Sequence, residues 1–316
     1  MGIAWTVVLI SPSFRCANKR GSAKLQLPLR RLPIPGPRSL QVSFPVCLGA
    51  SSLPRQSGVA LLGVHECPFL LIMALWLISI NVNGLHDGNK RAGLLQFLRC
   101  LPNPPDVVCL QEVHCVSEAD SCDWFRSSGF SVLASPGSPR SCGCAILYKP
   151  KLSLVASFCD AHGRLLHCSF SFADVTFNVA CLYAPNRKPA RDQSFDYVLD
   201  VVNPDPPTTL RGDFNTLFDR GLDRSGSDVD DSSRESTPSL IRLLDACAVV
   251  DIWRALHPSG RSFTWLRPNG SIASRIDLVG LPPSWVPFVS SCDHLPCPFS
   301  DHCAVALSVA VLRSGS

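Results

Sequence analysis

The sequence predicts an α/β fold in which two stacked β-sheets are covered by helices. Apolar runs of strand length lie in both halves of the chain, and amphipathic helical runs lie between them. In the middle of the chain, four strand-like runs follow one another without a helix. Domains of this kind pack their sheets against each other and against helices. We therefore expect two sheets packed face to face, with helices on the outside.

The chain divides by composition into two parts. Residues 1–72 are rich in Pro, Ser, Arg and Cys, show no sustained period of 2 or 3.6, and carry eight basic residues against one acid, a net charge of +7. Residues 73–316 carry the periodic runs, and their 21 basic and 24 acidic residues give a net charge of −3. We expect a poorly ordered basic leader over 1–72 and a folded domain over 73–316. A slightly acidic domain that handles nucleic acid must do so through local patches and a metal, not through bulk charge.

The expected elements follow in chain order. The run "ALWLISINV" (74–82) predicts a strand, leucines at helical spacing predict a helix over 89–101, and "DVVCLQE" (106–112) predicts the next strand. A second helix is expected over 239–250, with Pro238 in its first turn. The remaining expected elements are an antiparallel meander (143–148, 152–158, 164–172 and 175–183), a strand that ends at Leu210, a surface loop over 220–236, and closing strands over 275–281 and 302–309.

The sixteen cysteines argue against a secreted disulfide framework. Several sit inside apolar runs, as small buried hydrophobic residues do, and no CxxC pair occurs. The apolar start of the chain has no basic n-region or convincing cleavage site, and the apolar run 67–80 is short for a membrane span. We expect reduced thiols, no membrane segment, and a nuclear or cytoplasmic protein that is not secreted.

Polar side chains recur where the expected strands end. Each of these residues taken alone fits a turn, a cap or a solvated strand end, because Gly, Asp and Asn dominate turns. Ligand sites of α/β sheets gather at strand ends, so the recurrence favours one site built from several strands. The residues are Asn81 and Asn83, Gln111 and Glu112, Tyr183 and Asn186, Asp213 and Asn215, Asp277, and Ser300 with Asp301 and His302.

Six motifs in this order carry a resemblance to a known family. The stretches "SINVNGL", "CLQEVH", "LYAPN", "GDFN", "SRID" and "SDH" resemble the endonuclease/exonuclease/phosphatase superfamily over about Leu75 to Val309. Within it, "LDRSG", "VDIWRALHP" and "SFTW" are most similar to the apurinic-type endonuclease domain of LINE-type (non-LTR) retrotransposons. The resemblance implies a four-layer α/β sandwich, two mixed β-sheets flanked by helices as in DNase I, and makes 73–316 the catalytic domain. Asn83 stands where repair enzymes of the superfamily usually carry Asp.

The resemblance also implies the roles of the site residues. Glu112 is the expected Mg²⁺ carboxylate, with Asn81 and Asp301 as direct or water-mediated ligands, and Mn²⁺ able to substitute. Asp213 would orient and deprotonate the attacking water, and Asn215 would donate its amide N–H to a phosphate oxygen. His302 would contact the phosphate with Asp277 holding its ring. Further phosphate or DNA contacts are expected from Tyr183, Asn186, Thr264 and Ser300.

The stretch "WLRPNGSIASR" (265–275) predicts a hairpin, because Pro268, Asn269 and Gly270 separate two short strand-like pieces. Arg267 and Arg275 flank it. We expect its tip to lie beside the scissile phosphate and its arginines to contact DNA, because Arg in a narrow minor groove reads groove width and deformability. The alternative is a solvated connector.

The leading hypothesis is a Mg²⁺-dependent endonuclease that nicks double-stranded DNA for retrotransposition. A reverse transcriptase module is expected in a full-length element and is absent from this sequence; we expect the chain itself to be a monomer. One alternative is an abasic-site endonuclease or exodeoxyribonuclease III-like repair enzyme, which shares the chemistry. Others are a phosphatase acting on small phosphate esters, which lacks an evident basic pocket motif here, and an inactive remnant of an element.

Overall fold

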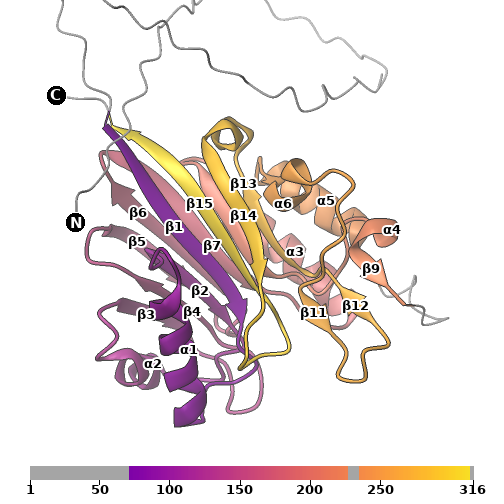
Figure 1. The fold of residues 1–316 in the computed structure, drawn as a ribbon, viewed down its shortest axis with the longest axis horizontal. Coiled ribbons are helices and arrows are strands. Elements are labelled where there is room, and N and C mark those ends of the chain that lie inside the picture. The colour runs from indigo at the N-terminus through magenta and orange to yellow at the C-terminus, as the bar shows by residue number, and fades with distance from the viewer. Residues whose placement is uncertain (1–70, 227–234, 314–316) are drawn as a thin grey trace, which may run out of the picture. The chain divides into compact units, whose positions relative to one another are not determined.

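The computed structural model describes residues 71–226 and 235–313, and the expected leader over 1–72 lies almost entirely outside them. Two six-stranded sheets form the described part (Figure 1). In order across the sheet, the first contains β14 (Val289–Leu295), β15 (Ala304–Arg313), β1 (Leu71–Asn81), β2 (Val107–Gln111), β4 (Cys144–Tyr148) and β3 (Ser131–Ser135). The second contains β10 (Val250–Asp251), β13 (Asp277–Leu281), β8 (Thr208–Asp213), β7 (Val175–Tyr183), β6 (Leu165–Phe172) and β5 (Ser153–Cys159).

Both sheets are mixed, and each has one parallel pair at its centre. In the first sheet β1 and β2 run parallel, and in the second β7 and β8 do; the other described neighbours are antiparallel. A parallel pair needs a crossover connection, and both crossovers here contain a helix. These are α1 (Gly88–Cys100), between β1 and β2, and α3 (Lys188–Val201), between β7 and β8.

The helices cover the outer faces of the sheets, as the sequence predicts. Alternate side chains of β1 show the division: Leu75 and Leu77 face a core shared by both sheets, while Ile78 and Ile80 pack with α1 and α2 (Glu118–Phe125). On the second sheet, α3 and α5 (Thr237–Ala246) pack over β7 and β8. The expected four-layer sandwich of two mixed sheets and flanking helices is therefore confirmed.

Most expected elements are present, and several differ from the expectation. The helix expected over 239–250 ends at Ala246, and the strand expected from 302 begins at Ala304. The strand at 143–148 joins the first sheet as β4, so the meander consists only of β5, β6 and β7. The expected loop over 220–236 contains α4 (Arg220–Asp223) and β9 (Arg224–Ser225), and its residues 227–234 lie outside the described part. The strand expected from 275 begins at Asp277.

Several elements were not predicted. The helix α3 escaped detection because the first residue of its buried stripe is Arg191, followed by Phe195 and Val198. An arginine at a core-facing position hides the apolar period that identifies a helix. The others are short or weakly periodic: α2, β3, β10, α6 (Ile252–Leu256), a 3₁₀ helix (Pro283–Phe288) and β14.

The expected hairpin is present. Strands β11 (Trp265–Leu266) and β12 (Ala273–Ser274) pair antiparallel, and β9 extends them to a small third sheet. Figure 1 shows this hairpin projecting from the body of the domain at the level where β1 and β14 end.

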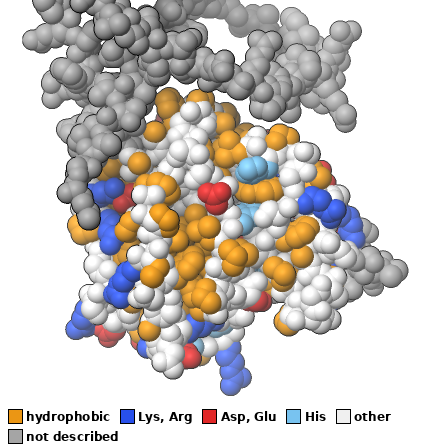
Figure 2. Space-filling view, in the orientation of Figure 1, with side chains coloured by type: hydrophobic (Ala, Val, Ile, Leu, Met, Phe, Trp, Pro, Cys, Tyr) orange, Lys and Arg blue, Asp and Glu red, His pale blue; other side chains and the backbone are white. Residues whose placement is uncertain are grey.

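The described cysteines are free thiols, and the basic side chains lie toward the rim of the face in Figure 2. None of the described cysteines forms a disulfide. Within the same ranges there is no helix both long and apolar enough to cross a bilayer. On the face in Figure 2, hydrophobic side chains gather at the centre over the first sheet, and Lys and Arg lie toward the rim.

The start of β1 gives a test of the domain boundary. Strand β1 begins at Leu71, two residues before the expected boundary, and Leu71–Ala74 pair with Ala310–Arg313. We expect a protein of residues 71–316 to melt at the temperature of the full chain. A protein of residues 75–316, which loses four ladder pairs, should melt about 2–4 °C lower for each kcal/mol lost. Thermal unfolding measures both, and a 71–316 protein that melts well below the full chain would contradict the expected boundary.

Candidate active site

The site lies where the two parallel pairs end. Asn81 and Gln111 are partners at the ends of β1 and β2, and Tyr183 and Asp213 are partners at the ends of β7 and β8. Parallel strands end at one edge of their sheet, and the face-to-face packing brings the two edges together. The antiparallel neighbour β13 begins opposite Asp213 with Asp277. Five strands thus bring polar side chains to one place.

The Asn81 side chain links the two sheets. Its Nδ2 donates to Oε1 of Glu112, which follows β2, at 2.8 Å, and to Oδ2 of Asp213, which ends β8, at 2.9 Å. Its Oδ1 accepts the backbone N–H of Asn83 at 3.0 Å. Asn81 is fully buried. The described contacts use both ends of the amide, so they favour a bracing role over the expected role as a metal ligand.

Three of the residues just beyond the strand ends have left-handed backbone. The φ angles are 45° at Asn83, 53° at Glu112 and 49° at Asn215. Asn adopts this region readily, but Glu does so rarely and at a free-energy cost. Strained backbone at three positions around one pocket is typical of a functional site whose surroundings hold it in place.

The Glu112 carboxylate is held by three side chains. Besides Asn81, the Nε2 atom of His114 lies 3.3 Å from its Oε2 atom, and Tyr183 donates its hydroxyl. Burial disfavours the charged form of Glu112, but these hydrogen bonds outweigh burial and lower its pKa. The carboxylate is therefore ionised and oriented before any substrate arrives. Tyr183 belongs to this cage, and burial raises the pKa of its phenol.

The Asp213 carboxylate is buried and strongly hydrogen-bonded. Its Oδ1 accepts the backbone N–H of Asn215 at 2.9 Å, and its Oδ2 accepts the Asn215 side chain at 3.2 Å. Burial and the nearby Asp277 raise its pKa to about 7. A carboxylate with this pKa suits a general base near neutral pH. The Asn215 amide also donates to the carbonyl of Ala184 at 2.9 Å. Both hydrogens of this amide, which was expected to donate to a phosphate oxygen, are therefore bonded within the protein.

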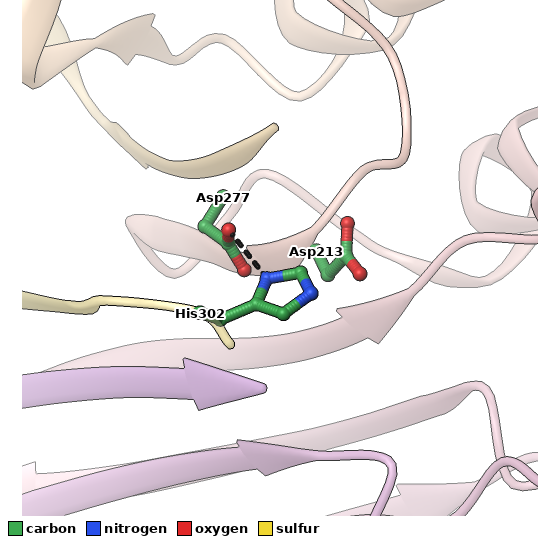
Figure 3. A group of neighbouring side chains, drawn as sticks. All are labelled: Asp213, Asp277 and His302. Atoms are coloured by element: carbon green, nitrogen blue, oxygen red, sulfur yellow. Dashed lines mark hydrogen bonds and ion pairs between the residues drawn. The ribbon is translucent and has the colours of Figure 1, made fainter. Parts of the chain in front are cut away.

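His302 forms the expected pair with Asp277. Its Nδ1 lies 2.9 Å from the Oδ2 atom of Asp277, and Figure 3 shows the imidazole between the Asp277 and Asp213 carboxylates. Burial opposes protonation, but the charge and hydrogen bond of Asp277 and the charge of Asp213 raise the pKa of His302 to about 10. At neutral pH the ring is an imidazolium, the form that binds a phosphate.

One pocket of about 360 Å³ joins these groups. Asp301 also lines it, and its carboxylate accepts Asn83 Nδ2 at 3.2 Å and the indole N–H of Trp265 at 3.1 Å. The lining residues are Asn83, Glu112, Asn186, Asp213, Asn215, Trp265, Ile276, Asp301 and His302. Seven of the residues expected at strand ends therefore line one cavity, although no sequence pattern placed Trp265 or Ile276 there.

The donor chemistry of the pocket fits a hard divalent cation. Glu112 and Asp301 line the pocket and offer carboxylate oxygens, the ligand type that Mg²⁺ and Mn²⁺ prefer. A second arrangement is also close enough: one ligand atom each from Asp213, Asp277 and His302 lie within 4.8 Å of one another. His302 Nδ1 is already bonded to Asp277, and Mg²⁺ prefers oxygen ligands, so we favour Glu112 and Asp301 as the residues that would hold the cation.

The polar groups of Thr264, Ser300 and Arg275, three residues expected to contact phosphate or DNA, are bonded within the protein. Thr264 is fully buried, and its hydroxyl accepts the backbone N–H groups of Ile276 and Asp277, both at 3.1 Å. Ser300 donates to the Asn81 carbonyl at 2.6 Å and accepts the His302 N–H at 3.1 Å. Both hydroxyls therefore hold the backbone of the segments that carry Asp277 and His302. Side-chain hydroxyls of this kind look like phosphate ligands in a sequence, because the sequence does not show which way they point.

Arg275 is likewise not available to DNA. It is fully buried, and its guanidinium binds both carboxylate oxygens of Asp223 at 2.7 and 2.9 Å and lies 2.7 Å from an oxygen of Asp251. Arg254 pairs with the same Asp223. Breaking a buried pair of this kind leaves an uncompensated charge and is strongly destabilising. Arg275 therefore anchors the base of the hairpin and the start of β13.

The other expected contacts stay predictions. Arg267 is half-buried on the hairpin. Asn186 lines the pocket, and the buried Arg191 holds its loop by donating to the carbonyls of Pro185 at 3.4 Å and Asn186 at 2.9 Å. Sequence reasoning missed Arg191 and gave His114 no role. His114 stands inside the "CLQEVH" motif, which was the signal that could have found it.

Comparisons with known proteins agree with this geometry. The model of the Endonuclease/Exonuclease/phosphatase family matches residues 78–302. A Transposon TX1 uncharacterized 149 kDa protein of Xenopus laevis is 28% identical over 250 residues, which are 77% of this chain and 18% of that protein. The chain thus spans about a fifth of the length of that relative.

Two solved structures show the same fold. The AP endonuclease LMAP from Leishmania major matches with a TM-score of 0.63 and 20% identity, covering 75% of this chain and 88% of that one. The 3′ phosphatase NExo from Neisseria, bound to a product DNA hairpin, matches with a TM-score of 0.57 and 19% identity, covering 74% and 98%. At these identities the likeness shows the fold alone.

The coupling of Asp213 and His302 through Asp277 gives a test by pH. In the wild type, the rate of any reaction catalysed here should rise as Asp213 loses its proton near pH 7 and fall as His302 loses its proton near pH 10. Asp277→Asn removes the repulsion that raises the pKa of Asp213 and the attraction that raises the pKa of His302. Both limbs of the pH–rate profile should then move to lower pH, by about one unit or more. Limbs that stay in place would contradict the coupling.

Proposed function

The chain belongs to the endonuclease/exonuclease/phosphatase family, and we propose that it is a divalent-metal-dependent endonuclease that nicks double-stranded DNA for a retrotransposon. The observation that carries the proposal is the arrangement around Asn81. One amide nitrogen contacts Glu112 and Asp213, and a His302 imidazolium shares their pocket. The site thus combines a carboxylate for a metal, a general base and a phosphate-binding cation, the three groups that phosphodiester hydrolysis requires.

The residues divide the reaction between them. Asp213 would orient the attacking water and accept its proton, and its pKa near 7 makes the basic form available at neutral pH. His302 would hold a non-bridging phosphate oxygen and stabilise the negative charge that develops there. Asn186 faces the same pocket and would donate a further hydrogen bond. When bound at Glu112 and Asp301, a divalent cation would add positive charge at the phosphate.

Two observations favour the transposon function over repair of abasic sites. The matching region of a transposon protein covers most of this chain. In addition, Asn83 at the pocket rim removes a negative charge that repair enzymes of the family usually carry there. Repair remains the alternative, because AP endonucleases share the fold. An inactive remnant is disfavoured by the site, since Glu112, Asp213 and His302 line one pocket.

A plasmid-nicking assay of the full chain with Mg²⁺ tests the function. We expect conversion of supercoiled to open-circular DNA, and comparable rates on intact and abasic duplexes. Glu112→Gln should lose about 100-fold or more of the rate, within the range typical of electrostatic groups, because an amide cannot balance the charge of a divalent cation. Excess Mg²⁺ should recover part of it. Wild-type rates in the variant at low Mg²⁺ would contradict the role of Glu112, and strict dependence on abasic sites would favour repair.

The hairpin gives a separate test of target choice. Arg267 N–H donates to the Ile272 carbonyl at 2.9 Å, so four residues (268–271) close the turn. Deleting the exposed Pro268 and Asn269 leaves Gly-Ser, a sequence suited to a two-residue type II′ turn. Because no pocket residue is removed, we expect similar total nicking but different nick positions on one plasmid. Mapping the 3′ ends by sequencing measures this, and an unchanged pattern would place target choice elsewhere. Deletion through Ile272 is unsuitable, because Ile272 is buried.

A further inference from the structure

Lys90 occupies a position that the stability of its helix does not explain. It lies in the first turn of α1, whose described N-terminal turn holds no acidic residue after the Asp87 N-cap. The N-terminus of a helix carries partial positive charge, so a cation there is unfavourable. Its neighbour Arg91 has a clear structural use, since it donates to the carbonyls of Leu85 and His86 at 2.6 and 2.7 Å. Among the described residues, Lys90 makes one side-chain hydrogen bond.

The described side-chain hydrogen bond of Lys90 points it to the pocket rim. Its Nζ donates to the carbonyl oxygen of Asn83 at 2.7 Å. Asn83 lines the pocket and in turn donates to Asp301. The ammonium group interacts electrostatically with Asp301 and Glu112 of the pocket and, more weakly, with the N-cap Asp87. An ammonium has three donors, so one bond to Asn83 leaves capacity for another acceptor.

We propose that Lys90 is the charge-balancing residue of the metal site. In the absence of a cation, its ammonium neutralises part of the negative charge of Glu112 and Asp301. When the cation binds, Lys90 is repelled from the carboxylates and contacts a phosphate oxygen of the DNA strand in the pocket. The inference rests on the proposed function, because it assigns a role to Lys90 at that same site.

This arrangement couples the two ligands. The cation must bind against the charge of Lys90, and DNA phosphate offers that charge a new partner. Each ligand therefore favours binding of the other, and the coupling is reciprocal by thermodynamic necessity. An enzyme with this coupling would bind its cation weakly in the absence of DNA and more tightly when DNA is bound.

The test compares Lys90→Met with Arg99→Met in the full chain. Both variants lose one positive charge from α1, but Arg99 is exposed in the last turn, about 13 Å along the helix from Lys90. Binding of Mn²⁺ to the DNA-free proteins is measured at low ionic strength by the electron paramagnetic resonance signal of free Mn²⁺. We expect Lys90→Met to bind Mn²⁺ about three- to tenfold more tightly than the wild type, the effect of one unit charge several ångströms away in a partly hydrated site. Arg99→Met should stay within about twofold.

A second measurement follows the DNA side of the coupling. In EDTA, Lys90→Met should bind a short duplex more weakly than Arg99→Met does, and Lys90→Arg should restore both properties. The melting temperature of Lys90→Met should change little, because the variant loses the attraction to Glu112 and Asp301 but also removes a cation from the helix N-terminus.

The outcomes separate the inference from the function. Equal Mn²⁺ affinities in Lys90→Met and Arg99→Met would overturn the charge-balancing role, even if DNA binding weakens. A wild-type protein that nicks DNA but binds Mn²⁺ no less tightly than Lys90→Met would overturn it while leaving the nuclease intact. A wild-type chain that neither binds Mn²⁺ nor nicks DNA would overturn both proposals.

Discussion

The whole site depends on the amide nitrogen of Asn81. It contacts a carboxylate from each sheet, Glu112 at 2.8 Å and Asp213 at 2.9 Å. The buried Asp213 and the half-buried Glu112 repel each other, and a donor between them offsets that repulsion. The amide can do this only because β1 and β2 end in register, and because the sheets pack so that β8 ends opposite them. The fold therefore sets the chemistry through one hydrogen-bonded side chain.

Much of this arrangement could be predicted from the sequence. Strand ends are visible as apolar runs that stop at Asn, Glu or Asp, and the recurrence of that pattern located the site. What remained hidden was orientation. Thr264 and Arg275 lie in expected motifs, but both point inward, to backbone N–H groups and to Asp223. A sequence gives the residue type at a strand end, whereas the direction of its side chain depends on pairing partners far along the chain.

The buried ion pairs around Arg275 support the site at the start of β13. Arg275 joins Asp223 of α4 to Asp251 of β10, and two residues later the chain supplies Asp277. Thr264 fixes the same segment through the Ile276 and Asp277 N–H groups. Precise catalytic geometry needs supporting contacts of this kind, because side chains at strand ends are otherwise free to rotate. The buried ion pairs of Arg275 thus help to hold Asp277 in place.

Because the site is divided between two sheets, the rate of catalysis depends on how the two sheets pack against each other. Glu112 belongs to one sheet and Asp213 to the other, and the apolar side chains of the shared core set the spacing of the two layers. Interiors are close-packed and transmit small displacements, and a shift of about 1 Å at a reacting group slows a reaction greatly. A change of one methylene group far inside the sandwich can therefore slow the enzyme while the fold stays intact. In such a protein, a defect in the core lowers the activity at a smaller displacement than the one that unfolds the domain.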